Sequence, residues 1–575
     1  MVIVGANVGS TKSGMPLNDG GCALYKDGVI YAIAEERLSR KKYVGGFKRA
    51  LEYCLDAAKV DIREVDLFVF SSCCEEPLTE DSIHLEGVGQ ERIWICKSHH
   101  LSHAFSTFCT SGFQQAVIIV IDNEGNVLDD KADKPFHQRE MEHMSYYLGD
   151  RQEIRLLHRD YVDPEYIGVG DAYRYFTHYL GFPSYEYAGK TMGLAAYGSD
   201  EPYKDHRVFE LRNGHIECRI RNNYENCIQS LSAFFDALGA DCPKPRSPLD
   251  DITQVHADLA RWIQRETEDI LVEKINHLVS QSGIRDVCIA GGIGLNSVAN
   301  AQILKRCKLD HLHIIPAAGD SGQCLGNVLY GLYLLTGKVP SLPMKTAYLG
   351  KEYSNEDIAD AVSSIATDSN IEVRRFDSLA SLAKEEASLI MQNKYVGHFY
   401  GRSEFGPRAL GNRSILANPC NPDSKDRLNQ RIKFRESFRP FAPVVIFEEA
   451  QDFFDLNEER PFMLIVSDVK DRSLIPSVTH VDGTARVQTI TENQNPQLYS
   501  LLEEFKKLSG VPILLNTSFN VAGEPIVETP MDAVKCFLST ALDALAISNY
   551  LIIKKTVSTK HDPFHDFITS LGRSL

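Results

Sequence analysis

The sequence predicts an α/β protein with more than one domain. Strand-like and helix-like segments alternate along the chain, glycine-rich segments follow strands directly at several places, and the alternation restarts after the octet TGKVPSLP at residues 336–343. A chain of 575 residues, 43% of them apolar, is long enough for roughly two to four globular units. We therefore expect one domain at residues 1–343 and a second at residues 344–575.

The N-terminal stretch predicts the start of an α/β layer. Strands are expected at residues 2–4, 22–25, 29–34 and 67–70, and a helix at residues 49–60. The second and third strands are joined by Lys26-Asp27-Gly28, a typical hairpin turn.

Three histidines lie within five residues in the segment SHHLSHA. Ser98 is a good helix N-cap, and His99 and His103, four residues apart, would share one helix face. A strand at residues 116–121 then delivers Asp122 at its C-terminal end, where sites of α/β proteins gather. The residues alone leave two interpretations open: a metal site with His99, His103 and Asp122, or satisfied core histidines.

Two further corners place glycines after a strand and before a helix. A long amphipathic helix at residues 255–279 precedes the strand at 287–290, which leads into GGIGLN at residues 291–296. A strand at 311–315 leads into PAAGDSG, with Asp320 at the tip. Such corners allow close approach of the backbone to a nucleotide, although the spacing is not that of a dinucleotide fingerprint.

The segment GKTMGL at residues 189–194 resembles the end of a P-loop. The upstream glycine of that motif is missing, because Ser184 stands in its place, so a Walker A site is rejected. Lys190 remains either a nucleotide ligand or an ordinary turn lysine.

The most basic stretch of this acidic chain is at residues 401–440. It holds nine Lys and Arg against four acidic residues, a local charge of 9 − 4 = +5, whereas the whole chain has 61 − 78 = −17. Gly406, Pro407 and Gly411 predict a loop, in which Arg408 could clamp an oxyanion. A solvated basic face is the alternative, but glycines that alternate with arginines favour an anion site.

The remaining segments predict a second α/β unit. Helices are expected near residues 378–393 and from Asn421-Pro422 onward, the latter as N-cap and first turn of a helix that carries Arg431, Lys433 and Arg435. Strands are expected at residues 395–400, 443–447, 481–490 and 511–515, and a turn after the last of them.

Composition limits the classes of function. The net charge of −17 argues against nucleic-acid binding through the general surface. Fourteen scattered cysteines without a metal-type CxxC pair indicate free thiols in a reducing compartment. Neither a signal peptide nor a long apolar run is visible, so we expect a cytoplasmic protein without a membrane partner, as a monomer or homodimer.

Eight ordered blocks that span nearly the whole chain resemble the O-carbamoyltransferase family of nodulation and antibiotic biosynthesis. They are AIAEERLSRKK, HHLSHA, GKTMGLAAYG, GGIGLN, GDSGQCLG, GRSEFGPRALGNRS, IKFRESFRPFAP and LLNTSFNVAGEPIV. The resemblance implies an actin-like (sugar-kinase-type) ATPase domain of two α/β lobes, followed by a YrdC-like α/β domain. It also implies that ATP and carbamoyl phosphate give carbamoyl-adenylate in the C-terminal domain, and that the N-terminal domain passes the carbamoyl group to a hydroxyl of a small-molecule natural product.

The resemblance also assigns residues to roles. It implies that carbamoyl phosphate and ATP are held in the C-terminal domain by Arg408, Lys433, Arg439, Arg486, Asn516, Thr517, Ser518 and Phe519. It implies an N-terminal nucleotide site with Lys190, Gly193, Gly291, Gly292, Asn296 and Asp320, and metal ligands His99, His103, Asp122 and Asp320. Arg408 and Lys433 would be catalytic in activation. Mixed N/O ligation favours Fe, Mn or Zn over Mg, and among these metals we expect Fe.

One departure concerns the base for transfer. The family has a His-Asp pair after its first strand, where this chain has Asn18-Asp19. We expect Asp19, or a metal-bound water, to act as the base. Two other classes are kept as alternatives: a tRNA threonylcarbamoyl-adenosine enzyme, disfavoured by the acidic balance, and an actin-like regulatory ATPase, which would leave the basic stretch unused.

Overall fold

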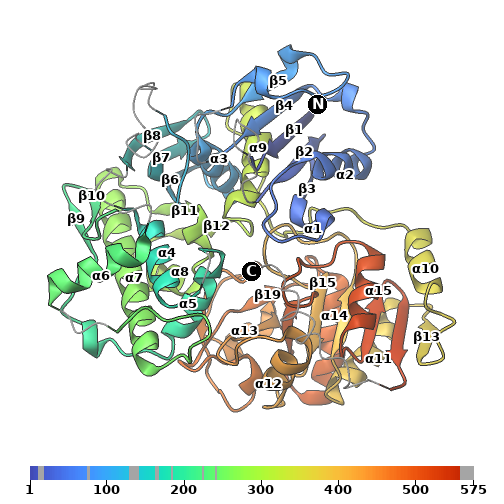
Figure 1. Ribbon diagram of the computed structural model, residues 1–575. Coiled ribbons are helices and arrows are strands. Elements are labelled where there is room, and N and C mark those ends of the chain that lie inside the picture. Colours follow the sequence, from blue (N-terminus) through green and yellow to red (C-terminus); the bar gives the residue numbers. More distant parts are fainter. Residues whose placement is uncertain are drawn as a thin grey trace.

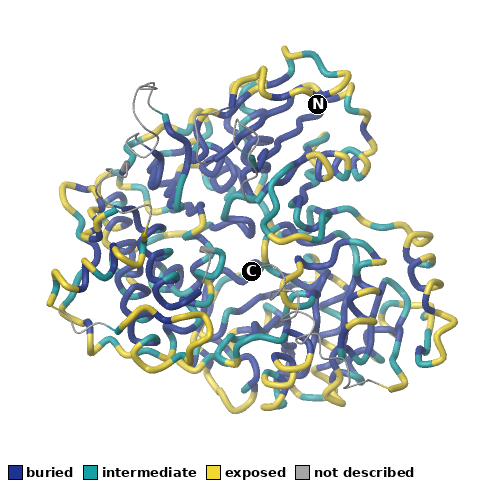
Figure 2. Tube along the Cα trace, viewed as in Figure 1, coloured by how far each residue is buried: buried dark blue, intermediate teal, exposed yellow. Residues whose placement is uncertain are grey.

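The computed structural model describes residues 1–10, 19–73, 78–128, 141–161, 167–182, 185–222, 226–239 and 243–556, and it has an α/β fold with three main sheets (Figure 1). The strands of these sheets are largely buried, whereas the exposed residues lie mainly on outer loops and helix faces (Figure 2). Among the described residues, no helix has the length and apolar character needed to cross a membrane.

The first sheet has the order β3-β2-β1-β4-β5. Its strands are β1 (Val2–Asn7), β2 (Gly21–Lys26), β3 (Val29–Ala34), β4 (Leu67–Ser71) and β5 (Ile93–Ile95). The first three strands pair antiparallel, and β1, β4 and β5 pair parallel. The helix α2 (Lys48–Ala58) packs on one face and α9 (Gln323–Thr336) on the other.

The second sheet repeats this connectivity. Its order is β12-β11-β6-β7-β8, formed by β6 (Gln115–Ile121), β7 (Glu142–Asp150), β8 (Ile154–Tyr161), β11 (Asp286–Ala290) and β12 (His311–Ile314). Again the first three strands along the chain, β6, β7 and β8, pair antiparallel. The last two, β11 and β12, pair parallel, with β11 next to β6. Counted along the chain, both sheets have the order third, second, first, fourth, fifth. This duplication confirms the predicted pair of α/β lobes of the actin type.

Four helices of the lobes position the sites described below. They are α3 (His99–Ser111), α5 (Ala188–Ala195), α7 (Gln254–Ser282) and α8 (Ser297–Arg306). Ser98 caps α3, as predicted, by accepting a hydrogen bond from the amide of Leu101.

The third sheet has eight strands in the order β13-β22-β21-β14-β15-β20-β16-β19. They are β13 (Ile371–Arg375), β14 (Val396–Phe399), β15 (Arg413–Ala417), β16 (Ala442–Ile446), β19 (Gln488–Ile490), β20 (Ile513–Ser518), β21 (Ala544–Ile547) and β22 (Tyr550–Lys554). The helices α11 (Leu379–Met391) and α14 (Pro496–Ser509) cover one face, and α10 (Asn355–Ser363) and α15 (Pro530–Ser539) the other.

Three local expectations were wrong. The helix expected from Asn421 begins only at Ser424: the side chain of Asn421 accepts a hydrogen bond from the amide of Asp423 at 3.1 Å, as an N-cap would, but the backbone of residues 422–423 forms a turn. The helix α12 (Ser424–Leu428) starts later and continues as a π-helical turn, Asn429–Lys433. The expected turn after residue 515 is instead the end of β20, and residues 481–490 form two short strands, β18 (Thr484–Ala485) and β19, in place of one.

The segment after α9 is hydrogen-bonded to the second lobe. The amides of Leu342 and Met344 donate to the carbonyls of Cys109 and Thr110 at 2.8 and 2.9 Å. The end of the octet at residues 336–343 is therefore bonded to the last turn of α3, and the division of the chain at residue 343 stays a prediction.

Candidate active site

Four predicted metal ligands come together in the second lobe. His99 and His103 project from α3, Asp122 follows β6, and Asp320 begins the turn before α9. One ligand atom of each residue lies within 4.8 Å of all the others. The Nε2 atoms of both histidines face the Oδ1 of Asp320, at 3.1 Å from His99 and 3.4 Å from His103. The predicted convergence of these four side chains is therefore present.

The electrostatics of this cluster fit a divalent cation. Burial lowers the pKa of His99, but the hydrogen bond and charge of Asp320, with Asp122, raise it to about 9. Burial and then the charge of Asp320 raise the pKa of Asp122 to about 8. Burial raises the pKa of Asp320, but His99 and His103 lower it overall, so its charge is compensated. The Asp122 carboxylate lacks such compensation, and a bound cation would supply it. Two imidazoles and two carboxylates are suitable ligands for Fe, Mn or Zn.

A buried carboxylate behind the cluster holds the first turn of α3. Glu142 accepts hydrogen bonds from the hydroxyl of Ser98 at 2.6 Å and from the amide of His100 at 3.4 Å, and it pairs with Arg159 at 3.0 Å. The amide of His99 donates to Asn126 at 2.9 Å. These contacts fix the helix that carries His99 and His103. Nothing in the sequence pattern pointed to Glu142.

Asp19 lies beside the same cluster. The side-chain amide of Asn7, at the end of β1, donates to the main-chain oxygens of Asp19 at 3.0 Å and Asp320 at 3.3 Å. Burial and then the charge of Asp320 raise the pKa of the Asp19 carboxyl well above its ordinary value. The neighbouring Asn18 lies outside the described residues. Asp19 is thus placed near the predicted transfer site, and its role as a base stays a prediction.

The first glycine corner contacts the metal ligands directly. Gly291 has φ +84°, and a Cβ there would lie 2.2 Å from the carbonyl oxygen of Ile121. The amide of Gly292 donates to the Oδ2 of Asp122 at 3.0 Å. Asn296 caps α8 through the amide of Ala299 at 3.1 Å, and its side chain also pairs with Gln264. Its amide group is thus already engaged by the protein.

The GKTMG segment is helical rather than a turn. Lys190 lies in α5, and its ammonium pairs with Glu436 of the C-terminal region at 2.6 Å. A Cβ on Gly193 would be 3.8 Å from the ring of Phe438, also in the C-terminal region. These two predicted nucleotide residues therefore face the C-terminal region and not the metal cluster.

The arginine loop, residues 401–412, is organised by one buried carboxylate. Oε1 of Glu404 accepts hydrogen bonds from the amides of Leu410, Asn412 and Arg413 at 2.8, 2.7 and 3.0 Å. Gly406 and Gly411 have φ +120° and +115°, which glycine alone adopts without strain. The predicted loop is confirmed, and Glu404 is the residue that shapes it.

Four arginines gather beside this loop: Arg408, Arg435, Arg439 and Arg486. We call them the arginine cluster. Burial and then the charge of Arg439 lower the pKa of Arg408 to about 10 and that of Arg435 to about 9. Burial, followed by Arg408 and Arg435, lowers the pKa of Arg486 well below its ordinary value. Among the described residues Arg439 pairs with Glu436 at 4.0 Å and the other three form no ion pair, so the positive charge of the cluster is only partly compensated.

Two of these arginines also lack partners. Among the residues that the structure describes, neither Arg408 nor Arg486 forms an ion pair, and the Nε of each is buried without a hydrogen-bond partner. Arginines that form no ion pair and have a buried, unbonded Nε beside a glycine loop are typical of an anion site. Arg435 was seen in the basic stretch but was not assigned to the site.

Lys433 is buried against the end of β20. Its ammonium donates to the side chain of Asn520 at 2.7 Å, to the main-chain oxygen of Asn520 at 3.1 Å, and to the main-chain oxygen of Ser518. Burial and then Arg435 lower the pKa of Lys433 well below its ordinary value. The protein thus already satisfies this ammonium, and a catalytic role stays a prediction.

The other residues predicted near Lys433 lie in β20 or directly after it. Asn516 donates to Gln488 at 2.8 Å, and Thr517 pairs with Ile415 in the sheet. The ring of Phe519 is fully buried in the core, which leaves only its main chain for a ligand.

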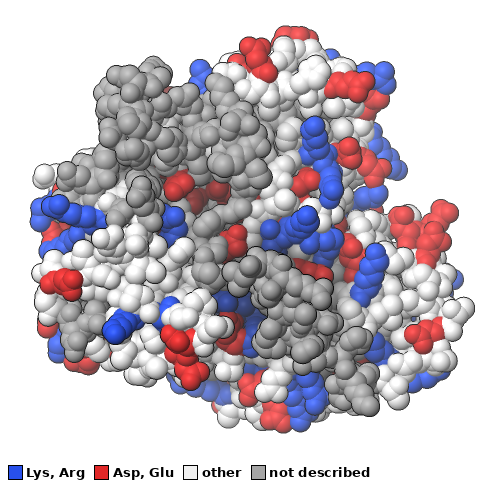
Figure 3. Space-filling view, in the orientation of Figure 1, with Lys and Arg blue, Asp and Glu red and all other residues white. Residues whose placement is uncertain are grey.

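On the face shown in Figure 3, Lys and Arg side chains lie beside Asp and Glu side chains around the recess near the middle of the view. The fold thus carries a histidine–aspartate cluster in one lobe and the arginine cluster in the C-terminal region, an arrangement that fits an enzyme. Residues 89–329 match the family model of the carbamoyltransferase N-terminus, and residues 387–554 match that of the carbamoyltransferase C-terminus. The chain belongs to this carbamoyltransferase family.

Relatives support the same assignment. Nodulation protein NolNO of Sinorhizobium fredii is 35% identical, over 94% of this chain and 80% of its own. An uncharacterized protein of Synechocystis, sll1178, is 34% identical over 93% of this chain and 95% of its own. A crystal structure of full-length HypF is similar to 59% of this chain, with 10% identity and a TM-score of 0.35. The enzyme class predicted from the sequence, a carbamoyltransferase, is confirmed by the family.

Proposed function

We propose that the protein is an ATP-dependent O-carbamoyltransferase that works in two steps at two sites. At the arginine cluster, carbamoyl phosphate loses its phosphoryl group to water, and an oxygen of the resulting carbamate displaces pyrophosphate from the α-phosphorus of ATP. Arg408 and Arg486 would stabilise the charge that develops on the phosphate oxygens. The observation that supports this step is that Arg408 and Arg486 form no ion pair among the described residues and that the Nε of each is buried without a hydrogen-bond partner.

In the second step a hydroxyl of a small-molecule acceptor attacks the carbamoyl carbon, and AMP leaves. Asp19 would take the proton of the hydroxyl, and its placement beside Asp320 supports this role. A divalent cation held by His99, His103, Asp122 and Asp320 would supply positive charge for the adenylate phosphate.

The test is mass spectrometry of the full-length protein with ATP, carbamoyl phosphate and divalent metals. The expected products are AMP and pyrophosphate, with carbamoyl-adenylate as an intermediate, and none of them without carbamoyl phosphate. Formation of ADP that does not depend on carbamoyl phosphate would instead identify a regulatory ATPase. Stimulation of ATP turnover by tRNA would favour threonylcarbamoylation.

Two variants separate the steps. Arg408→Ala should abolish carbamoyl-adenylate formation, and Asp19→Ala should leave it intact while stopping transfer to a hydroxylated acceptor. Full transfer by Asp19→Ala would reject Asp19 as the base.

A further inference from the structure

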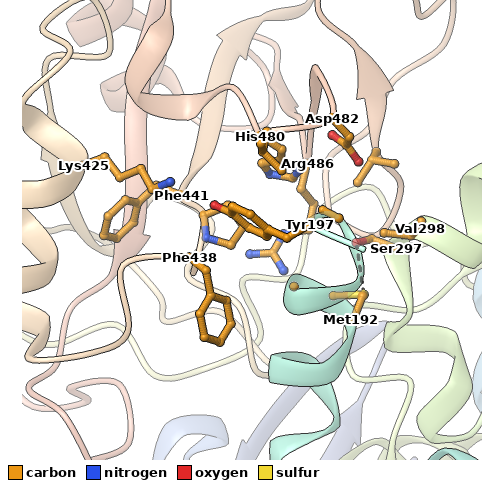
Figure 4. A pocket seen from close by; sticks show the side chains of 15 residues that line it. Met192, Tyr197, Ser297, Val298, Lys425, Phe438, Phe441, His480, Asp482 and Arg486 are labelled. Atoms are coloured by element: carbon orange, nitrogen blue, oxygen red, sulfur yellow. Dashed lines mark hydrogen bonds between the residues drawn. The ribbon is translucent and has the colours of Figure 1, made fainter. Parts of the chain in front are cut away.

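The C-terminal region contacts the two lobes in different ways. Where it meets the second lobe there is a pocket, to which the lobe contributes Met192 and Tyr197 and the C-terminal region Phe438 and Arg486 (Figure 4). The first lobe faces the C-terminal region with the short helix α1 (Glu35–Ser39) (Figure 1). This second boundary is made by hydrogen bonds from arginine side chains to main-chain oxygens.

Arg40, the residue directly after α1, holds the loop of residues 520–528. Its Nη1 donates to the carbonyl of Ile526 at 2.7 Å, and its Nη2 donates to the carbonyl of Pro525 at 2.8 Å. The carboxylates of Glu524 and Asp532 lie 3.6 and 3.9 Å from the guanidinium and compensate its charge. Two bonds from one rigid guanidinium fix both the position and the direction of this part of the loop.

The start of the same loop holds the ammonium of Lys433. The carbonyl of Glu524 accepts a hydrogen bond from the side-chain amide of Asn520 at 2.7 Å. The side-chain oxygen of Asn520 then faces Lys433, whose ammonium donates to it at 2.7 Å and to the main-chain oxygen of Asn520 at 3.1 Å. Arg40 of the first lobe thus reaches Lys433 through the loop and the side chain of Asn520.

The contacts of Lys433 locate its charge without cancelling it. In the described part of the chain, the acceptors of its ammonium are uncharged oxygens of Ser518 and Asn520. Neutral oxygens orient an ammonium, whereas a carboxylate would also compensate its charge. The positive charge therefore stays available to an anion, and its place depends on where the loop holds Asn520.

We propose that Arg40 is a positioning residue for activation: it holds the loop where Asn520 orients the ammonium of Lys433 toward the phosphate groups of the substrates. This inference rests on the proposed function, and it adds a residue that itself touches no substrate. It also means that activation in the C-terminal region depends on the first lobe. Arg40 lies in the sequence block AIAEERLSRKK, but the sequence gave it no role.

Substitution of Arg40 in the full-length protein separates this role from a general one. Arg40→Met removes the guanidinium and keeps an unbranched side chain, so the backbone at φ +60° meets no new steric demand. Arg40→Lys keeps the charge, but one ammonium on a flexible stem replaces the rigid pair of donors. The matched control is Arg63→Met, since Arg63 is an exposed arginine of the first lobe that pairs with Asp61, two residues away.

The expected result is a difference between the two steps. In Arg40→Met, kcat for AMP formation from ATP and carbamoyl phosphate should fall roughly 10- to 100-fold, the effect of a small displacement of a charged group in a site. Transfer from carbamoyl-adenylate supplied ready-made should stay within about twofold of the wild-type rate. Arg40→Lys should recover part of the lost rate, and Arg63→Met should match the wild type in both steps.

Hydrogen exchange measures the release of the loop directly. The amide of Val527 donates to the carbonyl of Phe519 at 2.9 Å and closes the loop. In Arg40→Met this amide should exchange at least about 10-fold faster than in the wild type, because the loop loses two hydrogen bonds from a charged donor. Its exchange in Arg63→Met should be unchanged. Thermal unfolding checks that the variants fold, and Arg40→Lys should show both effects at smaller size if Arg40→Met does not fold.

An unchanged kcat for AMP formation in a folded Arg40→Met would overturn the inference. So would unchanged exchange at Val527, or an equal loss of activation and transfer, which is the result of a merely structural role. If the wild-type protein forms no AMP, the proposed function fails separately, and equilibrium dialysis with labelled pyrophosphate still tests the positioning. Weaker binding of pyrophosphate by Arg40→Met than by Arg63→Met would then support it, and equal binding would reject it.

Discussion

Substitution of Glu404 should open the arginine loop. In the wild-type protein its Oε1 accepts hydrogen bonds from the amides of Leu410, Asn412 and Arg413, all buried. Glu404→Ala leaves these three donors without an acceptor inside the protein. Each buried donor that loses its partner costs about 1–3 kcal/mol. Even at the lower end, the three together cost about 3 kcal/mol, and the local opening of the loop should become more than about 100-fold easier.

Hydrogen exchange followed by mass spectrometry measures this opening at the three amides. In Glu404→Ala they should exchange more than about 100-fold faster than in the wild type, while the amides of α14 keep their protection. Glu404→Gln should fall between the two, because an amide oxygen still accepts but without the charge. The matched control is Glu503→Ala, an exposed position on α14. Wild-type exchange at Leu410, Asn412 and Arg413 in Glu404→Ala would refute the role given to this carboxylate.

Three further predictions concern the metal ligands, the boundary between the regions and the pH dependence of stability. His99→Ala should lose stoichiometric binding of Fe or Zn, measured by elemental analysis after dialysis, while the circular dichroism spectrum stays unchanged; retained metal would contradict the assignment. In a double-mutant cycle, Lys190→Ala and Glu436→Ala should show a coupling of at most about 1 kcal/mol, because both side chains are partly exposed; a much larger coupling would contradict this. Burial lowers the pKa of Lys274 to about 8, whereas a lysine in the unfolded chain has a pKa of about 10.4. Between these two pH values the unfolded state binds more protons than the folded state, so the free energy of unfolding should rise with pH. Lys274→Met should remove this rise, and parallel plots of melting temperature against pH for the two proteins would contradict it.

Local sequence patterns predicted that His99, His103, Asp122 and Asp320 lie close together. Ser98 caps a single helix, and His99 and His103 lie in its first turns. Asp122 and Asp320 each lie in the corner that follows a single strand. Parallel strands bring their C-terminal ends to the same edge of a sheet, so four local features were enough to bring these residues together. The Gly406 and Gly411 loop was predictable for the same reason, because glycine punctuation is a local signal.

Contacts between distant segments were not predictable from such patterns. Gly193 of α5 lies opposite Phe438, although the two residues are far apart in the sequence. No local pattern in either segment predicts that they come together. Glu142 and Glu404 resemble surface glutamates in the sequence, yet both are buried because amides or a guanidinium compensate the carboxylate. The helix expected from Asn421 begins at Ser424, since residues 422–423 form a turn first, and such a shift of a helix start is not visible in the local pattern.

The structure also bears on whether the two proposed steps can be separated by mutation. The helix α1 (Glu35–Ser39) of the first lobe contacts both sites: its first amide donates to the carbonyl of Gly20, next to Asp19, at 2.9 Å. From the same helix Arg37 donates to the carbonyl of Gly406 at 3.0 Å and so holds the arginine loop. These bonds use main-chain oxygens, and none of them involves the side chain of Arg408. Arg408→Ala should therefore remove a cation from the activation site without moving the loop or Asp19. The variant should still transfer the carbamoyl group from carbamoyl-adenylate supplied ready-made, and loss of both steps would mean that the guanidinium itself supports the transfer site.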